Sequence, residues 1–209
     1  MKNSTLYFFI LILFSFLLSY LSNELLNTDE LVINSLVEQF TTEQLNDILN
    51  YKEKWEWLGY LFIPFITLIK VSIIALAIDA GCFFFSKEIK YKKLFNIVVK
   101  AEFVFLLVII LKTAWFYSFQ PNFTLEDLQY FYPLSALNIV GYQGLEIWFV
   151  YPFQVLNLFE IAYWFILAYL IGKEINGTTE KGLSIVASSY GVALLIWVVG
   201  VMFLTLNMS

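Results

Sequence analysis

The feature that most restricts how this chain can fold is a series of long stretches that are almost free of charge. A helix needs about 20 mostly apolar residues to cross the hydrocarbon layer of a membrane. Five stretches reach or approach that length, and the first is the shortest. We therefore predict an all-α, polytopic membrane protein that forms a single domain over residues 1–209. The five predicted transmembrane helices cover residues 5–21, 60–85, 95–119, 152–172 and 183–206.

Composition narrows the chemistry that the protein can perform. Charged residues make up 14 % of the chain, against roughly 25 % in an ordinary soluble domain. There is no histidine, no arginine and a single cysteine, Cys82, which excludes Ser-His and Cys-His pairs, imidazole metal sites and thiolate clusters. The net charge of −5 argues against nucleic acid as a partner. We predict no metal and no cofactor, and we interpret Cys82 as a small apolar residue in a membrane helix.

The first predicted span has two interpretations. Lys2 followed by an apolar run fits a secretory signal peptide. A cleavage site needs small residues two positions apart, and the run from Ser19 to Asn23 does not supply them. We therefore expect an uncleaved membrane anchor.

Lysine is distributed unevenly among the segments that connect the spans. Residues 86–94 carry four lysines and one glutamate, and residues 173–182 carry two lysines and two acids. Residues 22–56 carry eight acids and two lysines, and residues 120–151 carry three acids and no lysine. Short loops that bear lysine tend to stay in the cytoplasm. We therefore predict a bacterial inner-membrane protein with a cytoplasmic N-terminus and a C-terminus outside.

The first outer segment, residues 22–56, has helical periodicity. Apolar residues between Leu31 and Phe40 recur largely at three- and four-residue spacing, and a second short helix is expected to follow. This pattern predicts an amphipathic helical hairpin that lies on the membrane surface or on the other spans, or a docking surface for a partner. The candidate N-cap residues are Thr28 or Asp29 for the first helix and Thr41 or Thr42 for the second.

The second outer segment, residues 120–151, is rich in tyrosine, phenylalanine and tryptophan. Thr124 is placed to cap a short helix that has Glu126 and Asp127 in its first turn. Aromatic residues settle at the level of the lipid headgroups, which favours an interfacial lid. The alternative is a groove for an acyl chain or an extended peptide.

Six charged residues lie within the predicted spans, where a charge costs several kcal/mol unless it meets a partner or water. At about 1.5 Å per residue they sort into two layers. We predict that Glu160 contacts Lys112 or Lys70, and that Asp79 lies near Glu102 or Lys100. The outer layer holds Lys70, Lys112 and Glu160, and the inner layer holds Asp79, Lys100 and Glu102.

These charges have three interpretations. They can be ion pairs that fix the register of the helices, or lysines such as Lys100 and Lys112 that reach the interface on their long stems. They can also form a path or binding site for an ion, a proton or an anionic headgroup. The candidate binding residues are Lys70, Lys112, Glu160, Asp79 and Glu102.

Small and hydroxyl-bearing residues in the fifth span favour close helix packing. Ser188, Ser189, Tyr190 and Gly191 are expected to allow close contact and bonds between helices, and Gly200 another close approach. A catalytic dyad of a serine (Ser72, Ser188 or Ser189) with Lys70 or Lys112 is conceivable. No local motif supports it.

The last two spans resemble the C-terminal half of the bacterial Yip-type (Ypt-interacting-protein-like) membrane proteins. The resemblance lies in residues 157–164, continuing to Ile171 and Gly172, and then in residues 184–203. It implies five spans, a cytoplasmic N-terminus and a non-enzymatic adaptor role. The long acidic segment after the first span departs from the family pattern.

Three functions fit the sequence. The leading hypothesis is a non-enzymatic accessory or scaffold protein that works with membrane lipid and with a membrane-protein partner or a second copy of itself. The alternative is a small permease or ion-coupled carrier that uses the buried lysines and carboxylates. The third is a membrane enzyme that acts on lipid or peptide.

Overall fold

The computed structural model describes residues 2–37 and 40–208, and most of these residues are helical. Within them there is no β-strand, and a single β-bridge joins Ser135 to Asn157. The predicted all-α class is therefore confirmed. The elements are α1 Lys2–Leu25, α2 Thr28–Leu36, α3 Thr42–Phe84, α4 Tyr91–Glu102, α5 Val104–Ser118, α6 Leu125–Tyr130, α7 Leu137–Val140, α8 Ile147–Val155, α9 Leu158–Glu174, α10 Thr179–Val186, the π-helical turn η1 Ala187–Gly191, and α11 Val192–Met208.

Four helical stretches in the described residues are long and apolar enough to cross a membrane, which is compatible with an integral membrane protein. The third joins α4 to α5, and the fourth joins α10 to α11 through η1. The predicted fourth span, 152–172, is divided between α8 and α9, because the chain leaves the helical conformation at Leu156 and Asn157. The four stretches are Thr5–Leu25, Glu43–Phe84, Tyr91–Ser118 and Thr179–Met208.

The sequence predicts a separate helical hairpin in the first outer segment, and the described structure does not contain it. The helix predicted after Thr41 continues without a break into the second span, so that α3 is 43 residues long. Thr41 caps it as expected, in a capping box with Gln44. The expected caps of α2 are wrong, because Asn27 occupies that position in a left-handed conformation without a side-chain cap.

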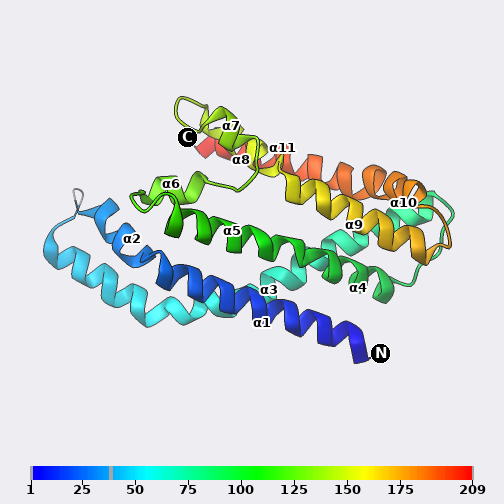
Figure 1. The fold of residues 1–209 in the computed structure, drawn as a ribbon, viewed down its shortest axis with the longest axis horizontal. Helices are drawn as coiled ribbons and strands as arrows, with labels where there is room; N and C mark the ends of the chain where they lie inside the picture. The colour runs from blue at the N-terminus through cyan, green and yellow to red at the C-terminus, as the bar shows by residue number, and fades with distance from the viewer. Residues whose placement is uncertain (1, 38–39, 209) are drawn as a thin grey trace.

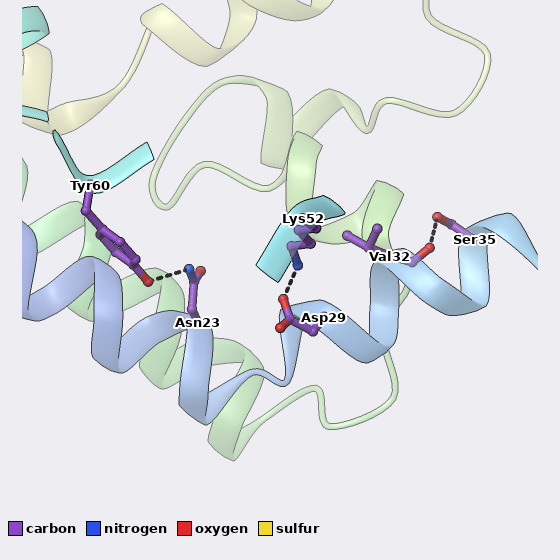
Figure 2. Close-up of polar contacts among 6 residues, drawn as sticks. All are labelled: Asn23, Asp29, Val32, Ser35, Lys52 and Tyr60. Atoms are coloured by element: carbon purple, nitrogen blue, oxygen red, sulfur yellow. Dashed lines mark hydrogen bonds and ion pairs between the residues drawn. The ribbon is translucent and has the colours of Figure 1, made fainter. Parts of the chain in front are cut away.

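Side-chain contacts tie this outer segment to the rest of the bundle. Lys52 of α3 forms an ion pair with Asp29 of α2, and the Asn23 amide donates a 3.2 Å bond to the Tyr60 hydroxyl (Figure 2). Within α2, the Ser35 hydroxyl donates to the Val32 carbonyl (Figure 2). Helices α1, α2 and α3 are therefore linked at the end of the molecule that carries the acidic segment.

The long helices run side by side along the longest axis of the molecule (Figure 1). The N-terminus lies at the end where α4 and α10 begin, and the C-terminus lies toward the end that holds α2, α6 and α7 (Figure 1). The two lysine-bearing connections, 86–94 and 173–182, adjoin α4 and α10 and therefore share the end with the N-terminus.

Small residues let the helices of the core approach closely. A Cβ atom on Gly182 of α10 would lie 1.9 Å from the Ala168 carbonyl oxygen of α9, and one on Gly191 would lie 2.5 Å from the Trp164 ring. Gly191 thus has the packing role expected of it. Gly200 does not, because a Cβ atom added there would meet nothing within 4 Å. Cys82 is buried in the core, as expected for a small apolar residue.

Candidate functional site

A buried carboxylate, Glu102, joins three helices at the centre of the bundle. The Lys70 ammonium of α3 donates a 2.8 Å bond to Glu102 Oε2, and the Tyr163 hydroxyl of α9 donates a 2.9 Å bond to Oε1. The Glu102 side chain is 7 % exposed, and the Lys70 Nζ also lies 4.3 Å from the centre of the Phe105 ring. Both carboxylate oxygens of Glu102 therefore have donors, as a charge at this depth requires.

A second carboxylate, Glu160, lies in the first turn of α9. Its Oε1 accepts a 2.9 Å bond from the Trp164 indole and a 2.7 Å bond from the Tyr190 hydroxyl of η1. The Asn157 side chain caps the helix by accepting a 2.8 Å bond from the Glu160 backbone N–H. The two carboxylates therefore belong to one polar cluster, linked through Tyr163 and Tyr190, whose rings pack edge to face at 5.4 Å.

The predicted arrangement of the charges in two layers is wrong, because Lys70 pairs with Glu102 across them. Helix α4 begins at Tyr91, four residues before the predicted span. Measured along the helices from the lysine-bearing end, Glu102 therefore lies about 16 Å deep, and Lys70 and Glu160 lie about 21 Å deep. These three charges form a single central layer instead of two.

Lys112 and Asp79 lie outside this layer. By the same measure Asp79 is about 7 Å and Lys112 about 31 Å from the lysine-bearing end. Neither has a hydrogen-bond or ion-pair partner among the residues that the structure describes. Among these residues Lys112 therefore does not contact Glu160, and Asp79 does not pair with Lys100. The Lys100 ammonium lies 5.2 Å from the centre of the Tyr7 ring instead.

Every helix of the polar cluster except α3 has an irregularity beside it. Helix α4 ends at Glu102, α9 begins two residues before Glu160, and the π-helical turn η1 contains Tyr190. π-helical turns are rare and are frequently found at functional sites. Irregular backbone at membrane depth occurs where protein covers it or where it lines a cavity. The positions of these breaks therefore mark the surroundings of Glu160 as the candidate functional site.

A groove of about 1370 Å³ lies beside the cluster, with Glu160 in its wall. It is enclosed by α5, by the chain from α6 to α7, and by α9, α10 and α11. At its end the Phe131 ring stacks on Trp115 at 5.6 Å and meets Phe116 at 5.1 Å. The aromatic segment 120–151 thus contributes a wall of the groove, which was one of its two predicted structures.

The groove is mostly apolar and reaches the surface of the bundle. Ile139, Ile161 and Phe165 line it and are each more than half exposed. Pockets for drug-sized ligands have volumes of roughly 300–1,000 Å³. A space of this size and polarity suits the hydrocarbon part of a membrane molecule, which could enter from the side.

Polar residues gather at the start of α9, where the groove meets the cluster. Backbone bonds from Ala136 N–H to the Leu156 carbonyl (2.8 Å) and from Leu158 N–H to the Leu134 carbonyl (3.2 Å) hold the two segments together. This pairing places Ser135, which is 2 % exposed, in the wall of the groove beside Asn157. The Ser135 hydroxyl has no hydrogen-bond partner in the described part of the chain.

Sequence reasoning missed Ser135 and Tyr163. The bond between helices that it expected from the hydroxyl of Tyr190 is confirmed, but its acceptor, Glu160, was not named. Nothing in the sequence marks Ser135, since the pairing that buries it is not local. The spacing of Asn157 and Glu160 is that of an N-cap and the third helical residue, which could have shown where α9 begins. Tyrosines within apolar spans could have been considered as hydrogen-bond donors to the carboxylates.

A third carboxylate, Asp127, lies at the outer part of the groove in the capping box of α6. The Thr124 backbone N–H and hydroxyl donate bonds of 2.9 and 2.8 Å to its Oδ2, which confirms Thr124 as the predicted cap. The Tyr142 hydroxyl donates a 2.8 Å bond to Oδ1. The backbone bond from Thr124 is the main reason that the pKa of Asp127 is lowered from 3.8, and the bond to Asp127 raises the pKa of Tyr142.

No family model matches the sequence, no curated protein is significantly similar to it, and no solved structure significantly resembles its fold. The resemblance of the last two spans to Yip-type proteins therefore stays a prediction.

The described residues do not form the conceivable Ser-Lys dyad. The Ser188 and Ser189 hydroxyls donate to backbone carbonyls of their own helix, at 2.8 and 2.6 Å, and Lys70 is bonded to Glu102. The described part of the chain also contains no group of three or more side chains that could hold a metal ion. The Glu160 carboxylate provides a hydrogen-bond acceptor and a negative charge beside an apolar groove.

Proposed function

We propose that the protein is a non-enzymatic integral membrane protein that binds the hydrocarbon chains of a membrane lipid in the groove. The observation that carries the proposal is the groove itself, with its large volume and apolar walls. Exposed apolar residues at its rim give lipid chains a route from the surrounding membrane. Lipid binding of this kind suits an accessory protein that acts alongside other membrane components.

The proposal includes five crossings of a bacterial inner membrane. Helix α9 is the additional crossing, the fourth in chain order, and its 17 residues approach the length that a crossing needs. The arrangement of Figure 1, with the two termini toward opposite ends of the bundle, fits an odd number of crossings. Because the lysine-bearing connections share the end with the N-terminus, we assign that end to the cytoplasm.

The alternative of an ion-coupled carrier has less support. Both oxygens of Glu102 already accept bonds, from Lys70 and Tyr163, and a buried carboxylate that is bonded in this way is poorly placed to receive an ion. Lys112 and Asp79 lie at other depths and do not extend the cluster into a path.

Photo-crosslinking tests the proposed function. A phospholipid with a photoreactive group in its acyl chain is reconstituted with the protein in vesicles, and labelled peptides are identified by mass spectrometry. We expect labelling of groove residues such as Ile161 and Leu137, the second of which is only 1 % exposed. Labelling confined to residues outside the groove would contradict the proposal.

A pair of variants tests whether the labelled lipid occupies the groove. Ala187→Phe places a ring in the groove, because Ala187 lines it. Val199→Phe adds the same ring to an exposed position on α11 that does not line it. We expect Ala187→Phe to remove most of the labelling at Leu137 and Val199→Phe to leave it unchanged; equal labelling in both variants would count against a lipid in the groove.

A further inference from the structure

We infer that the groove is selective for lipids whose headgroup carries an ammonium that can donate hydrogen bonds, with Glu160 as the acceptor. This inference rests on the proposed function and adds the class of headgroup that the groove selects. It stands on three observations: a free carboxylate oxygen, a buried hydroxyl without a partner, and the sign of the charge around the groove.

The first observation is the uneven bonding of Glu160. Both of its bonds, from Trp164 and Tyr190, end on Oε1. Oε2 receives no hydrogen bond from any residue in the described ranges. Glu102, by contrast, has a donor on each oxygen. Glu160 is also the member of the pair that lines the groove, so its free oxygen is available to a ligand there.

The second observation is Ser135, which lies in the same wall. Its side-chain oxygen is buried and has no partner among the residues that the structure describes. A buried hydroxyl that makes no hydrogen bond is destabilising, so native structures usually pair such groups with protein or a bound molecule. A ligand that reaches Glu160 at the start of α9 would pass close to Ser135, because Ser135 is bridged to Asn157, three residues before Glu160.

The third observation is the charge of the groove. The ionisable acids in its lining are Glu160 and Asp127, and no lysine of the described chain lines it. Lys70, the lysine nearest to the cluster, is bonded to Glu102. A headgroup with a net negative charge would therefore meet like charge without a counter-ion, whereas the ammonium of a zwitterionic headgroup meets opposite charge. The same argument disfavours the anionic headgroup that the sequence left open.

Hydrogen-bond donation separates the inference from simple attraction of charge. A primary ammonium offers three donors, so it can donate to Glu160 Oε2 and keep donors for a neighbouring acceptor such as the Ser135 hydroxyl. A quaternary ammonium has the same charge but cannot donate. A bond to a charged group is worth about 1.5–3 kcal/mol, and we therefore expect a primary ammonium to be preferred by about tenfold or more.

Native mass spectrometry of the full-length protein tests this preference. The protein in mild detergent is offered equal amounts of phosphatidylethanolamine, phosphatidylcholine and phosphatidylglycerol with identical acyl chains. We expect phosphatidylethanolamine adducts to exceed each of the others by about tenfold. Equal adducts, or a preference for phosphatidylglycerol or phosphatidylcholine, would overturn the inference.

Three variants locate the preference. Glu160→Gln keeps an oxygen for Trp164 and Tyr190 but loses the charge, and we expect the preference to fall below about twofold. Ser135→Ala removes only an unpartnered buried oxygen, so the free protein should be at least as stable as the parent while the preference declines. Asp79→Asn removes a carboxylate that does not line the groove and should leave the preference unchanged. A full preference in both Glu160→Gln and Ser135→Ala would overturn the assignment.

The outcomes distinguish this inference from the proposed function. Labelling of the groove by photoreactive lipid without any preference among headgroups would retain the groove as a lipid site and reject the role of Glu160. Absence of both labelling and adducts would reject the proposed function as well.

Discussion

At the scale of single residues, the centre of the bundle is organised by tyrosine hydroxyls that donate to carboxylates. Tyr163 donates to Glu102, and Tyr190 donates to Glu160. In surroundings of low dielectric constant each such bond is stronger than in water, and an unpaired charge is correspondingly costly. The bonds link α4 to α9 and α9 to η1, so they also fix how these helices sit against one another.

A double-mutant cycle measures the pairing of Lys70 with Glu102. Lys70→Met leaves the buried Glu102 with Tyr163 as its remaining donor, so we expect the single variant to lose more stability than the pairing alone explains. Adding Glu102→Gln should recover part of the loss, with a coupling of about 0.5–3 kcal/mol in unfolding experiments in micelles.

Lys112→Met is the matched control for that cycle. Lys112 has no ion-pair partner in the described part of the chain. The loss in the free energy of unfolding caused by Lys112→Met should add to the loss caused by Glu102→Gln within about 0.5 kcal/mol. A coupling as large as that of Lys70 would show that the ion pair is not specific.

The lowered pKa of Asp127 predicts how stability changes with pH outside the membrane. A carboxyl whose pKa is lower in the folded protein stabilises the fold at pH values above its unfolded pKa. That contribution is lost as the pH falls through the folded value, which lies below 3.8. We expect Asp127→Asn to lower the thermal midpoint at pH 6, and the difference from the parent to shrink steadily below about pH 4.

Glu126→Gln serves as the control for Asp127. Glu126 lies in the same turn, but in the described structure the carboxylate that accepts bonds from Thr124 is that of Asp127. Its effect on the thermal midpoint should not follow the pH dependence of Asp127→Asn. An equal dependence in the two variants would assign the effect to the net charge of the turn.

The residues that bear charge could be identified from the sequence, but their partners could not. The predicted depth of Glu102 depends on where its span begins at the inner end, and a beginning that is four residues too late moves Glu102 by about 6 Å. That error placed Glu102 apart from Lys70. The burial of Ser135 depends on the pairing of segments 134–136 and 156–158, for which a local pattern gives no signal.

At the scale of helices, the fold combines long spans with closely packed small residues and breaks at defined places. The caps at Thr41 and Thr124 could be predicted because they depend on neighbouring residues only. The continuation of α3 through residues 42–84 and the break before α9 could not, because neighbouring helices decide where a helix ends. The π-helical turn likewise has no signature in the sequence.

Glycine substitutions test the packing of α9 against α10. Gly182→Ala would place a Cβ atom 1.9 Å from the Ala168 carbonyl oxygen, which is backbone and cannot move aside cheaply. We expect a loss of about 3 kcal/mol or more in the free energy of unfolding, measured in micelles. Gly200→Ala has open space around it and should instead stabilise α11 by about 0.5–1 kcal/mol. Similar effects from both substitutions would contradict the close crossing.

At the scale of the whole molecule, charge divides the protein into two ends with an apolar body between them. The connections 86–94 and 173–182 carry lysines at one end, and the acid-rich outer segments lie at the other. The all-helical class and the positions of four apolar helices could be predicted from the length and composition of the apolar stretches. The groove could only be suggested, because its walls come from helices far apart in the sequence.

The orientation of the chain across the bilayer tests the account most directly, since the depth of every charge and the position of the groove depend on it. Single cysteines at Lys87, Gln143 and Asn207, in a Cys82→Ala background, are treated with a maleimide that cannot cross membranes, in intact bacterial spheroplasts. All three positions are exposed. We predict that Gln143→Cys and Asn207→Cys react at once and that Lys87→Cys reacts only after the membrane is opened. Labelling of Lys87→Cys and Asn207→Cys from the same side would contradict the five crossings.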